Sequence, residues 1–173
     1  MPLPDDSLRV AIAGAASLRG QDLKLWMEET GFPAGEVRLF DEEPLAGTLT
    51  EVAGEAAFVQ AIDEDSFEGL RFVFFAGSRA FAKQHGLAAA RAGATVIDLT
   101  GELAGVGGAR AWVPRLDAIL GPPQVAASPV VGGHVFSAPS APAMVACSFC
   151  SAVAPLRPKR VVMTFFSPAS ERG

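Results

Sequence analysis

The first apolar run of this chain leads straight into a turn bounded by glycines, and this junction constrains the fold more than any other feature. Val10–Ala13 reads as a short buried strand, and the seven residues after it begin with Gly14 and end with Gly20. A helical stretch follows, Gln21–Thr30, and Gly31 ends it. A doubly wound α/β domain builds its nucleotide site in this order, because the helix N-terminus offers backbone N–H groups to a pyrophosphate.

The turn departs from the usual nucleotide-binding pattern at one position. Ser17 stands where a third glycine usually lies between Gly14 and Gly20, and a side chain there crowds the approach of the backbone to a phosphate. A dinucleotide bound at this turn is expected to contact Ala16, Ser17 and Leu18 as well as the two glycines. The alternative is that Gly14 and Gly20 are required only by the backbone conformation of the turn, without a ligand.

Composition narrows the class of protein and its partners. The 173 residues suffice for one domain with a sizeable core, or for one domain and part of another. The chain is 50% hydrophobic, and its net charge is −5 without a long Lys/Arg cluster, which argues against binding to nucleic acid or an anionic membrane. The N-terminus does not resemble a signal peptide, and no apolar run approaches the ~20 residues of a membrane span. We therefore expect a cytoplasmic protein.

Strand-like and helix-like segments alternate along the rest of the chain. The expected helices after Gly31 are Ser78–Arg91 and Ala143–Ala154, and a hairpin is expected around Gly54. The continuous apolar run of Phe72–Phe75 is typical of a central parallel strand that is covered on both faces. Helical connections between strands predict βαβ units, and therefore a Rossmann-like, doubly wound, mostly parallel sheet. The further expected strands are Glu36–Phe40, Leu49–Val52, Ala56–Gln60, Thr95–Asp98 and Ala111–Pro114.

Several landmarks have the order and the approximate spacing of a known family. They are Gly14–Gly20, Glu28–Pro33, Asp63–Gly69, Phe75–Ser78, Ala92–Asp98, Trp112–Pro114 and Pro158–Val162. With them the chain resembles the N-terminal half of the aspartate-semialdehyde dehydrogenase family. The resemblance implies a Rossmann-like dinucleotide-binding domain over residues 1–140, with cofactor contacts also at Ala76, Gly77 and Ser78. It implies further that residues 141–173 are the helix and strand that begin a second, catalytic and dimerisation domain.

The family reaction is the NADP-dependent reductive dephosphorylation of an acyl phosphate to a semialdehyde, and its nucleophile is a cysteine thiolate. That cysteine lies at a helix start in an Asn-Pro-Asn-Cys motif, where the helix dipole lowers its pKa. The matching residues here run from Ala138 to Ala141, so the resemblance places Ala141 at the nucleophile position. Ser140 has no neighbouring histidine to act as a base. We therefore expect the covalent chemistry to be impaired.

The two cysteines, Cys147 and Cys150, form a C-x-x-C pattern inside the expected helix. A metal site would require two more ligands, which His85 and His134 are not placed to supply. We expect both thiols to be small core side chains. A displaced nucleophile and a disulfide are the alternatives.

The acidic turn after the second expected strand bears on cofactor choice. The family commonly carries a Ser/Arg turn there that holds the 2′-phosphate of NADP, whereas this chain has Asp41, Glu42 and Glu43. Carboxylates repel a 2′-phosphate and accept hydrogen bonds from a ribose diol, so NAD is favoured over NADP. The alternative is a solvated turn without a ligand. Asp98 is retained from the family pattern, although an acid at the end of a strand often only caps a turn.

Four functions stay open. The resemblance favours a non-catalytic dinucleotide-binding domain, and an interaction module without nucleotide comes next, since Ser17 and the acidic turn disfavour a phosphate. The others are the first half of an active dehydrogenase and an unrelated doubly wound domain that shares the landmarks by chance. The apolar segment Arg160–Phe166 is expected to form a strand that pairs with a second copy of the chain or packs against its own domain.

Overall fold

The computed structural model describes residues 8–52, 55–113 and 133–166. The chain divides into two compact units. The first comprises Met1–Trp112 and Val125–Ala138, and the second comprises Val113–Gln124 and Pro139–Gly173. Each unit is described by itself.

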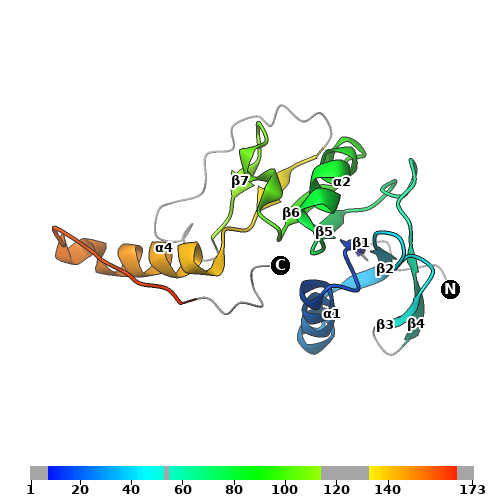
Figure 1. Ribbon diagram of the computed structural model, residues 1–173, viewed down its shortest axis with the longest axis horizontal. Helices are drawn as coiled ribbons and strands as arrows, with labels where there is room; N and C mark the ends of the chain where they lie inside the picture. The colour runs from blue at the N-terminus through cyan, green and yellow to red at the C-terminus, as the bar shows by residue number, and fades with distance from the viewer. Residues whose placement is uncertain (1–7, 53–54, 114–132, 167–173) are drawn as a thin grey trace. The chain divides into compact units, whose positions relative to one another are not determined.

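The first unit is built on an eight-stranded sheet of order β3-β4-β2-β1-β5-β6-β8-β7 (Figure 1). Neighbouring strands are parallel throughout, except that β3 and β4 form an antiparallel pair. This arrangement confirms the predicted doubly wound, mostly parallel sheet. The strands are β1 (Leu8–Ala13), β2 (Ala34–Phe40), β3 (Leu49–Val52), β4 (Glu55–Gln60), β5 (Phe72–Phe75), β6 (Thr95–Asp98), β7 (Arg110–Ala111) and β8 (Val135–Ser137).

Two helices cover opposite faces of this sheet. Successive residues of a strand point to opposite faces. Val10 and Ile12 of β1 pack in the same cluster as Met27 of helix α1 (Leu18–Thr30). Ala11 and Ala13 pack in the other cluster, with the buried side chains of helix α2 (Arg79–Arg91). The central strand β1 is therefore covered on both sides, and all four of these β1 side chains are fully buried.

Both helices end where the sequence predicts, at Thr30 and Arg91, while α1 begins three residues before the predicted Gln21 and α2 begins one residue after the predicted Ser78. Ser17 precedes α1, and its hydroxyl oxygen accepts a hydrogen bond from the Gly20 N–H, while Ser78 caps α2 in the same way at Phe81. Gly31 ends α1 in the left-handed conformation, with φ of 61°. Serine caps and a C-terminal glycine satisfy backbone groups that a helix leaves without partners.

The structure departs from the predicted strands at two places in the first unit. β8, which lies between β6 and β7 in the sheet, is absent from the strands that the sequence predicts. β7 covers only Arg110–Ala111, so the predicted strand over 111–114 is too long, and Pro114 lies outside the described residues. The predicted β3–β4 hairpin forms, with Leu49 opposite Phe58, while its tip at Gly54 is not described.

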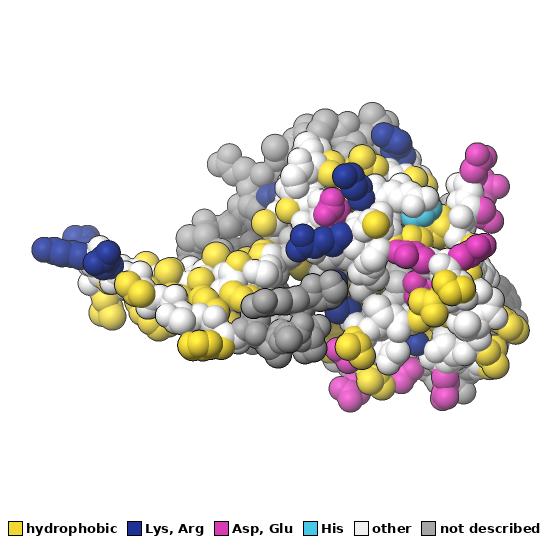
Figure 2. Space-filling view, in the orientation of Figure 1, with side chains coloured by type: hydrophobic (Ala, Val, Ile, Leu, Met, Phe, Trp, Pro, Cys, Tyr) yellow, Lys and Arg dark blue, Asp and Glu magenta, His cyan; other side chains and the backbone are white. Residues whose placement is uncertain are grey.

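The second unit holds helix α4 (Ala141–Val153), the short 3-10 helix η2 (Ala154–Leu156) and a segment without regular structure over residues 157–166. Within the described part of this single chain, residues 160–166 form no strand and have no hydrogen-bonded neighbour, and the expected pairing of this segment with a second copy stays a prediction. No side chain of α4 is buried, and hydrophobic side chains gather along this unit in Figure 2.

Cys147 and Cys150 are both exposed and free. The expectation that they belong to the core is therefore wrong. Across the described ranges, no helix is long and apolar enough to cross a membrane.

Helix α1 packs closely against the turn that precedes it, at Gly14 and Ala15. A Cβ atom on Gly20 would lie 2.3 Å from the Gly14 carbonyl oxygen and 2.9 Å from the Cα atom of Ala15. Neither neighbour is a flexible side-chain end, so only a residue without a Cβ fits. Gly105 differs, because it lies in the 3-10 helix η1 (Glu102–Gly105), where an added Cβ would meet no atom within 4 Å.

We expect Gly20→Ala to lower the free energy of unfolding by about 2–4 kcal/mol, because α1 must move away from the turn at Gly14 and Ala15 to admit the methyl group. Gly105→Ala is the matched control, and it should leave the stability unchanged or raise it by up to about 1 kcal/mol. Urea denaturation of the three proteins measures both values. Equal stability of the Gly20 variant and the parent chain would contradict the close packing.

Candidate functional site

The candidate site lies beyond the carboxyl ends of β1 and β5, where the strand order reverses. β1 lies between β2 and β5, so the connections on its two sides run in opposite directions. Open α/β sheets bind their ligands in the crevice at such a switch point. The loops that follow β1 and β5 touch there. A Cβ on Gly14 would lie 2.1 Å from the Gly77 nitrogen, and a Cβ on Gly77 would lie 2.9 Å from the Gly14 Cα.

Ser17 joins these two loops. Its hydroxyl lies 2.8 Å from the Gly14 carbonyl oxygen and 2.9 Å from that of Ala76, so its single hydrogen is donated to one of them at a time. The same oxygen accepts from the Gly20 N–H at 3.0 Å. The hydroxyl is thus turned toward the loops and caps α1. From the sequence alone Ser17 is only an obstacle to a phosphate, so this joining role is one that sequence reasoning missed.

Asp41 ties the acidic turn to the glycine turn. Its side chain is buried, with one carboxylate oxygen 2.8 Å from the Ala16 nitrogen and the other 2.9 Å from the Glu42 nitrogen. Both nitrogens donate. The Ala16 N–H, one of the donors that a nucleotide-binding turn could offer to a phosphate, is therefore already bound to a carboxylate of the chain itself.

Glu42 and Ser78 connect the ends of β2 and β5. The Glu42 carboxylate accepts a hydrogen bond from the Ser78 hydroxyl, and the same serine caps α2. The structure thus gathers the predicted residues at one edge of the sheet. Leu18 is exposed, and 74% of its surface is open to solvent. The full predicted set is Gly14, Ala16, Ser17, Leu18, Gly20, Asp41, Glu42, Ala76, Gly77 and Ser78.

One titratable residue near this edge has no role in the sequence-based prediction. The His85 ring lies against Phe81, with ring centroids 4.9 Å apart. Burial lowers the pKa of the His85 imidazole, and the Glu42 carboxylate opposes that shift. No sequence motif connects His85 with the acidic turn, because the two are close only where α2 packs beside that turn.

Asp98 holds a turn at the end of β6. It is fully buried, and its carboxylate accepts hydrogen bonds from the Thr100 nitrogen and hydroxyl, the Leu103 nitrogen and the Ser137 hydroxyl. Four donors from three segments saturate the carboxylate. Of the two interpretations of this acid, turn capping is therefore the one that the structure supports.

Within the second unit, Ala141 is the first residue of α4 and Ser140 is its N-cap residue. Cys147 lies six residues further on, which corresponds to about 9 Å along the helix axis. The thiols of the chain are thus remote from the helix start. In the described part of the chain, no three His, Cys, Asp or Glu side chains lie together in a group that could hold a metal ion.

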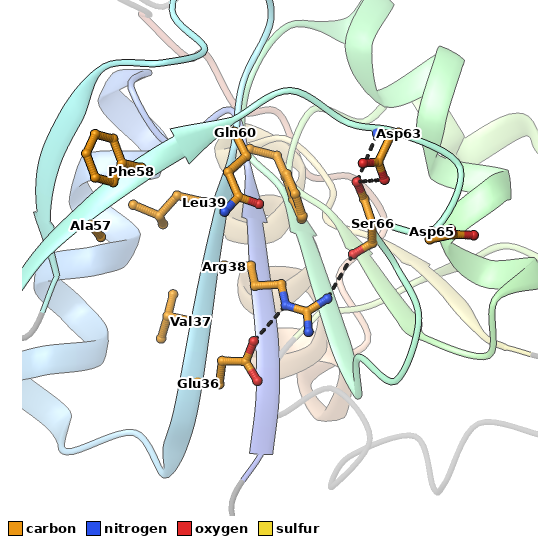
Figure 3. A pocket seen from close by; sticks show the side chains of 11 residues that line it. Glu36, Val37, Arg38, Leu39, Ala57, Phe58, Gln60, Asp63, Asp65 and Ser66 are labelled. Carbon is orange, nitrogen blue, oxygen red and sulfur yellow. Dashed lines mark hydrogen bonds and ion pairs between the residues drawn. The ribbon is translucent and has the colours of Figure 1, made fainter.

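A hollow of about 520 Å³ lies between β2, β4 and the 63–66 turn (Figure 3). Arg38, Glu36 and Asp63, which line it, have partners within the chain. Arg38 contacts Glu36 at 2.7 Å and donates to the Ser66 carbonyl oxygen at 3.4 Å, while the Ser66 hydroxyl donates to Asp63 at 2.5 Å and lowers the pKa of that carboxyl. These contacts fasten the turn to the sheet, and we assign the hollow no ligand.

Comparison with known proteins identifies the family. The family model "Semialdehyde dehydrogenase, NAD binding domain" matches residues 9–130. A USG-1 protein homolog of Azotobacter vinelandii is 32% identical over 97 residues, which cover 56% of this chain and 29% of that protein. An aspartate-semialdehyde dehydrogenase of Corynebacterium glutamicum is 37% identical over 93 residues, which cover 51% of this chain and 27% of that enzyme.

Solved structures agree with this match. A probable aspartate-semialdehyde dehydrogenase from Pseudomonas aeruginosa superposes with a TM-score of 0.67 and 26% identity, over 87% of this chain and 42% of that one. The enzyme from Candida albicans, solved with NADP, shares the fold, with a TM-score of 0.57 and 15% identity over 87% of this chain and 47% of that one. The chain thus spans less than half the length of these relatives. It belongs to the semialdehyde dehydrogenase family, whose NAD-binding domain it contains.

Proposed function

We propose that this chain binds a dinucleotide at the crevice beyond β1 and β5, prefers NAD to NADP, and lacks the covalent chemistry of its family. The observation that carries the proposal is the close contact of the Gly14 and Gly77 loops at the switch point of the sheet. In this family such a crevice serves a nicotinamide dinucleotide, which supplies hydride transfer when it is bound.

The residues at the start of α1 fit a pyrophosphate. The N–H groups of Leu18 and Arg19 belong to the first helical turn and have no acceptor within the helix. They remain for an anion after Asp41 has taken the Ala16 N–H and Ser17 has taken that of Gly20. The partial positive charge of the helix N-terminus adds to their attraction.

The acidic turn sets the proposed preference for NAD. Glu42 and Glu43 are exposed, so their charges face whatever approaches the end of β2. Two unit charges about 6 Å apart repel by about 1–3 kcal/mol at effective dielectric constants of about 20–80. A 2′-phosphate would meet this repulsion, whereas a ribose hydroxyl would find hydrogen-bond acceptors.

Calorimetric titration should show saturable binding of NAD, and NADP should bind at least about tenfold more weakly. In the double variant Glu42→Gln/Glu43→Gln, NADP should bind about three- to tenfold more tightly than to the parent chain, because two repelling charges are gone. Glutamine at position 42 keeps an oxygen that can accept from Ser78.

The matched control is Glu64→Gln/Glu68→Gln, which removes the same charge from the turn before β5. It should leave both affinities unchanged. Tighter binding of NADP than of NAD to the parent chain would contradict the proposed role of the acidic turn, and the absence of binding by either dinucleotide would contradict the proposed function itself.

The proposed loss of covalent chemistry rests on the start of α4. A thiolate nucleophile at this position would be stabilised by the helix N-terminus, but the methyl group of Ala141 can neither attack an acyl group nor hold a proton. Cys147 and Cys150 lie too far along the helix to share that stabilisation, since the dipole effect fades within the first turn. The chain can then bind and orient a dinucleotide without forming an acyl-enzyme.

A cysteine introduced at position 141 tests this interpretation. In a Cys147→Ser/Cys150→Ser background, the variant Ala141→Cys should react with iodoacetamide at pH 7 about tenfold faster than the native thiols do, because the helix start lowers its pKa. Mass spectrometry of timed samples gives the rates. A rate no faster than that of the native cysteines would argue against Ala141 as the nucleophile position.

A second candidate function is an interaction module that uses this fold without nucleotide. One observation favours it, namely that the buried Asp41 carboxylate occupies the Ala16 N–H and so acts as an internal anion at the turn. The titration described above separates the two functions, since the module would bind neither dinucleotide.

We also propose that two copies of the chain associate through residues 160–166. The segment leaves Val162 79% exposed and Phe166 94% exposed, and it pairs with no strand among the described residues. An extended apolar segment with unpaired backbone groups is a template for pairing with another copy.

Size-exclusion chromatography with light scattering should give a mass of twice 17.9 kDa at micromolar concentration. Val162→Lys should shift the protein toward the monomer, because it places a charge on the apolar segment. Lys83, exposed on α2, offers the control Lys83→Gln, which should leave the mass unchanged. A monomer for the parent chain at every concentration would refute this association.

A further inference from the structure

The exposed cysteine pair on α4 has no part in the proposed function. Its spacing and the small side chains beside it indicate a separate role. Cys147 and Cys150 are one helical turn apart on an unbroken helix, and both are free. Residues three apart lie on one face of a helix with Cβ atoms about 5–6 Å apart. The two thiols can therefore act on the same partner.

That spacing suits a shared metal better than a disulfide. A disulfide requires Cβ atoms about 3.5–4.5 Å apart, so an intrahelical bond would distort α4. Two sulfurs bound to one zinc ion at about 2.3 Å with tetrahedral angles lie about 3.8 Å apart. Side chains whose Cβ atoms are about 5–6 Å apart reach this separation by turning their sulfurs toward each other.

The neighbours of the pair on its own side of the helix are mostly small. The residues three or four positions from the cysteines are Ala143, Met144, Ala146, Ser151, Val153 and Ala154. Four of these six are alanine or serine, and they flank the thiols along one stripe, Ala143–Ala146–Ser151–Ala154. The bulkier Val145 and Phe149 lie outside this stripe. A second helix could thus approach the thiols closely.

Two thiolates make half of a tetrahedral site. A structural zinc site takes four ligands, commonly four cysteines. Helix α4 itself supplies only two, because both histidines of the chain lie outside it. We propose that α4 binds Zn²⁺ together with α4 of a second copy, so that Cys147 and Cys150 of each chain supply the four sulfurs. The four thiols lose their protons as the four zinc–sulfur bonds form, and no electron transfer takes place.

Titration with Co²⁺, a spectroscopic substitute for zinc, tests this site on the full chain under a metal-free phosphine reductant. Co²⁺ should produce the absorption bands of tetrahedral thiolate coordination, saturate at one ion per two chains, and be displaced by Zn²⁺. Four protons per metal ion should be released into a weakly buffered solution. Saturation at one ion per chain, or no thiolate bands, would overturn the proposal.

Two pairs of variants sharpen the test. Cys147→Ser and Cys150→Ser should each abolish the bands. Ala146→Leu keeps both thiols but places bulk in the small stripe, so it should prevent the two-chain complex, while Val145→Leu outside the stripe should not. Circular dichroism of each variant verifies that α4 still forms.

The metal-dependent pairing is distinguishable from the association through residues 160–166. Val162→Lys should leave the one-to-two metal stoichiometry and the metal-induced doubling of mass intact, because it does not alter α4. Loss of the cobalt bands in this variant would show that the cysteines depend on the other interface and would overturn an independent metal site.

Discussion

The contact between the Gly14 and Gly77 loops is the constraint on which the first unit depends. These loops follow adjacent parallel strands, and their backbones approach so closely that neither position admits a Cβ. Gly20 extends the same constraint to α1. Backbone packing thereby holds the helix start and the ends of β1 and β5 together, while the side chains of Asp41 and Glu42 join the acidic turn to them.

The hydrogen bonds of Ser17 and Asp41 stabilise the glycine turn, but they also occupy N–H groups that a phosphate could bind. Ser17 and Asp41 each satisfy backbone N–H groups of the glycine turn, which stabilises the turn when no ligand is present. The same bonds reduce the number of donors left for a phosphate. Donors at Leu18 and Arg19 remain, because the first turn of a helix has more N–H groups than one serine cap can satisfy.

Local signals in the sequence predicted the parts of the fold that depend on local interactions. The helical stretches and Gly31 predicted the helix ends to within three residues, and the apolar run at Phe72–Phe75 identified a central strand. Strand pairing is not local, which explains why β8 was missed and why residues 160–166 form no strand in the single chain. β8 is three residues long and is stabilised by β6, far away in the sequence, whereas the apolar segment 160–166 has the composition of a strand without a neighbour to pair with.

The candidate site, too, was predictable only where it depends on local sequence. The sequence order of strand, glycine turn and helix predicted that these residues lie at one edge of the sheet, but the contacts of Ser17 and Asp41 span 59 and 25 residues of chain. The exposure of Cys147 and Cys150 could not be deduced either, because an apolar helix resembles a core helix whether or not anything covers it. Exposed apolar surface of this kind is typical of a site that binds a partner or a ligand. Since the small side chains beside the thiols admit close approach and the larger ones lie elsewhere, a ligand that draws two such helices together binds the thiols and covers this surface at once.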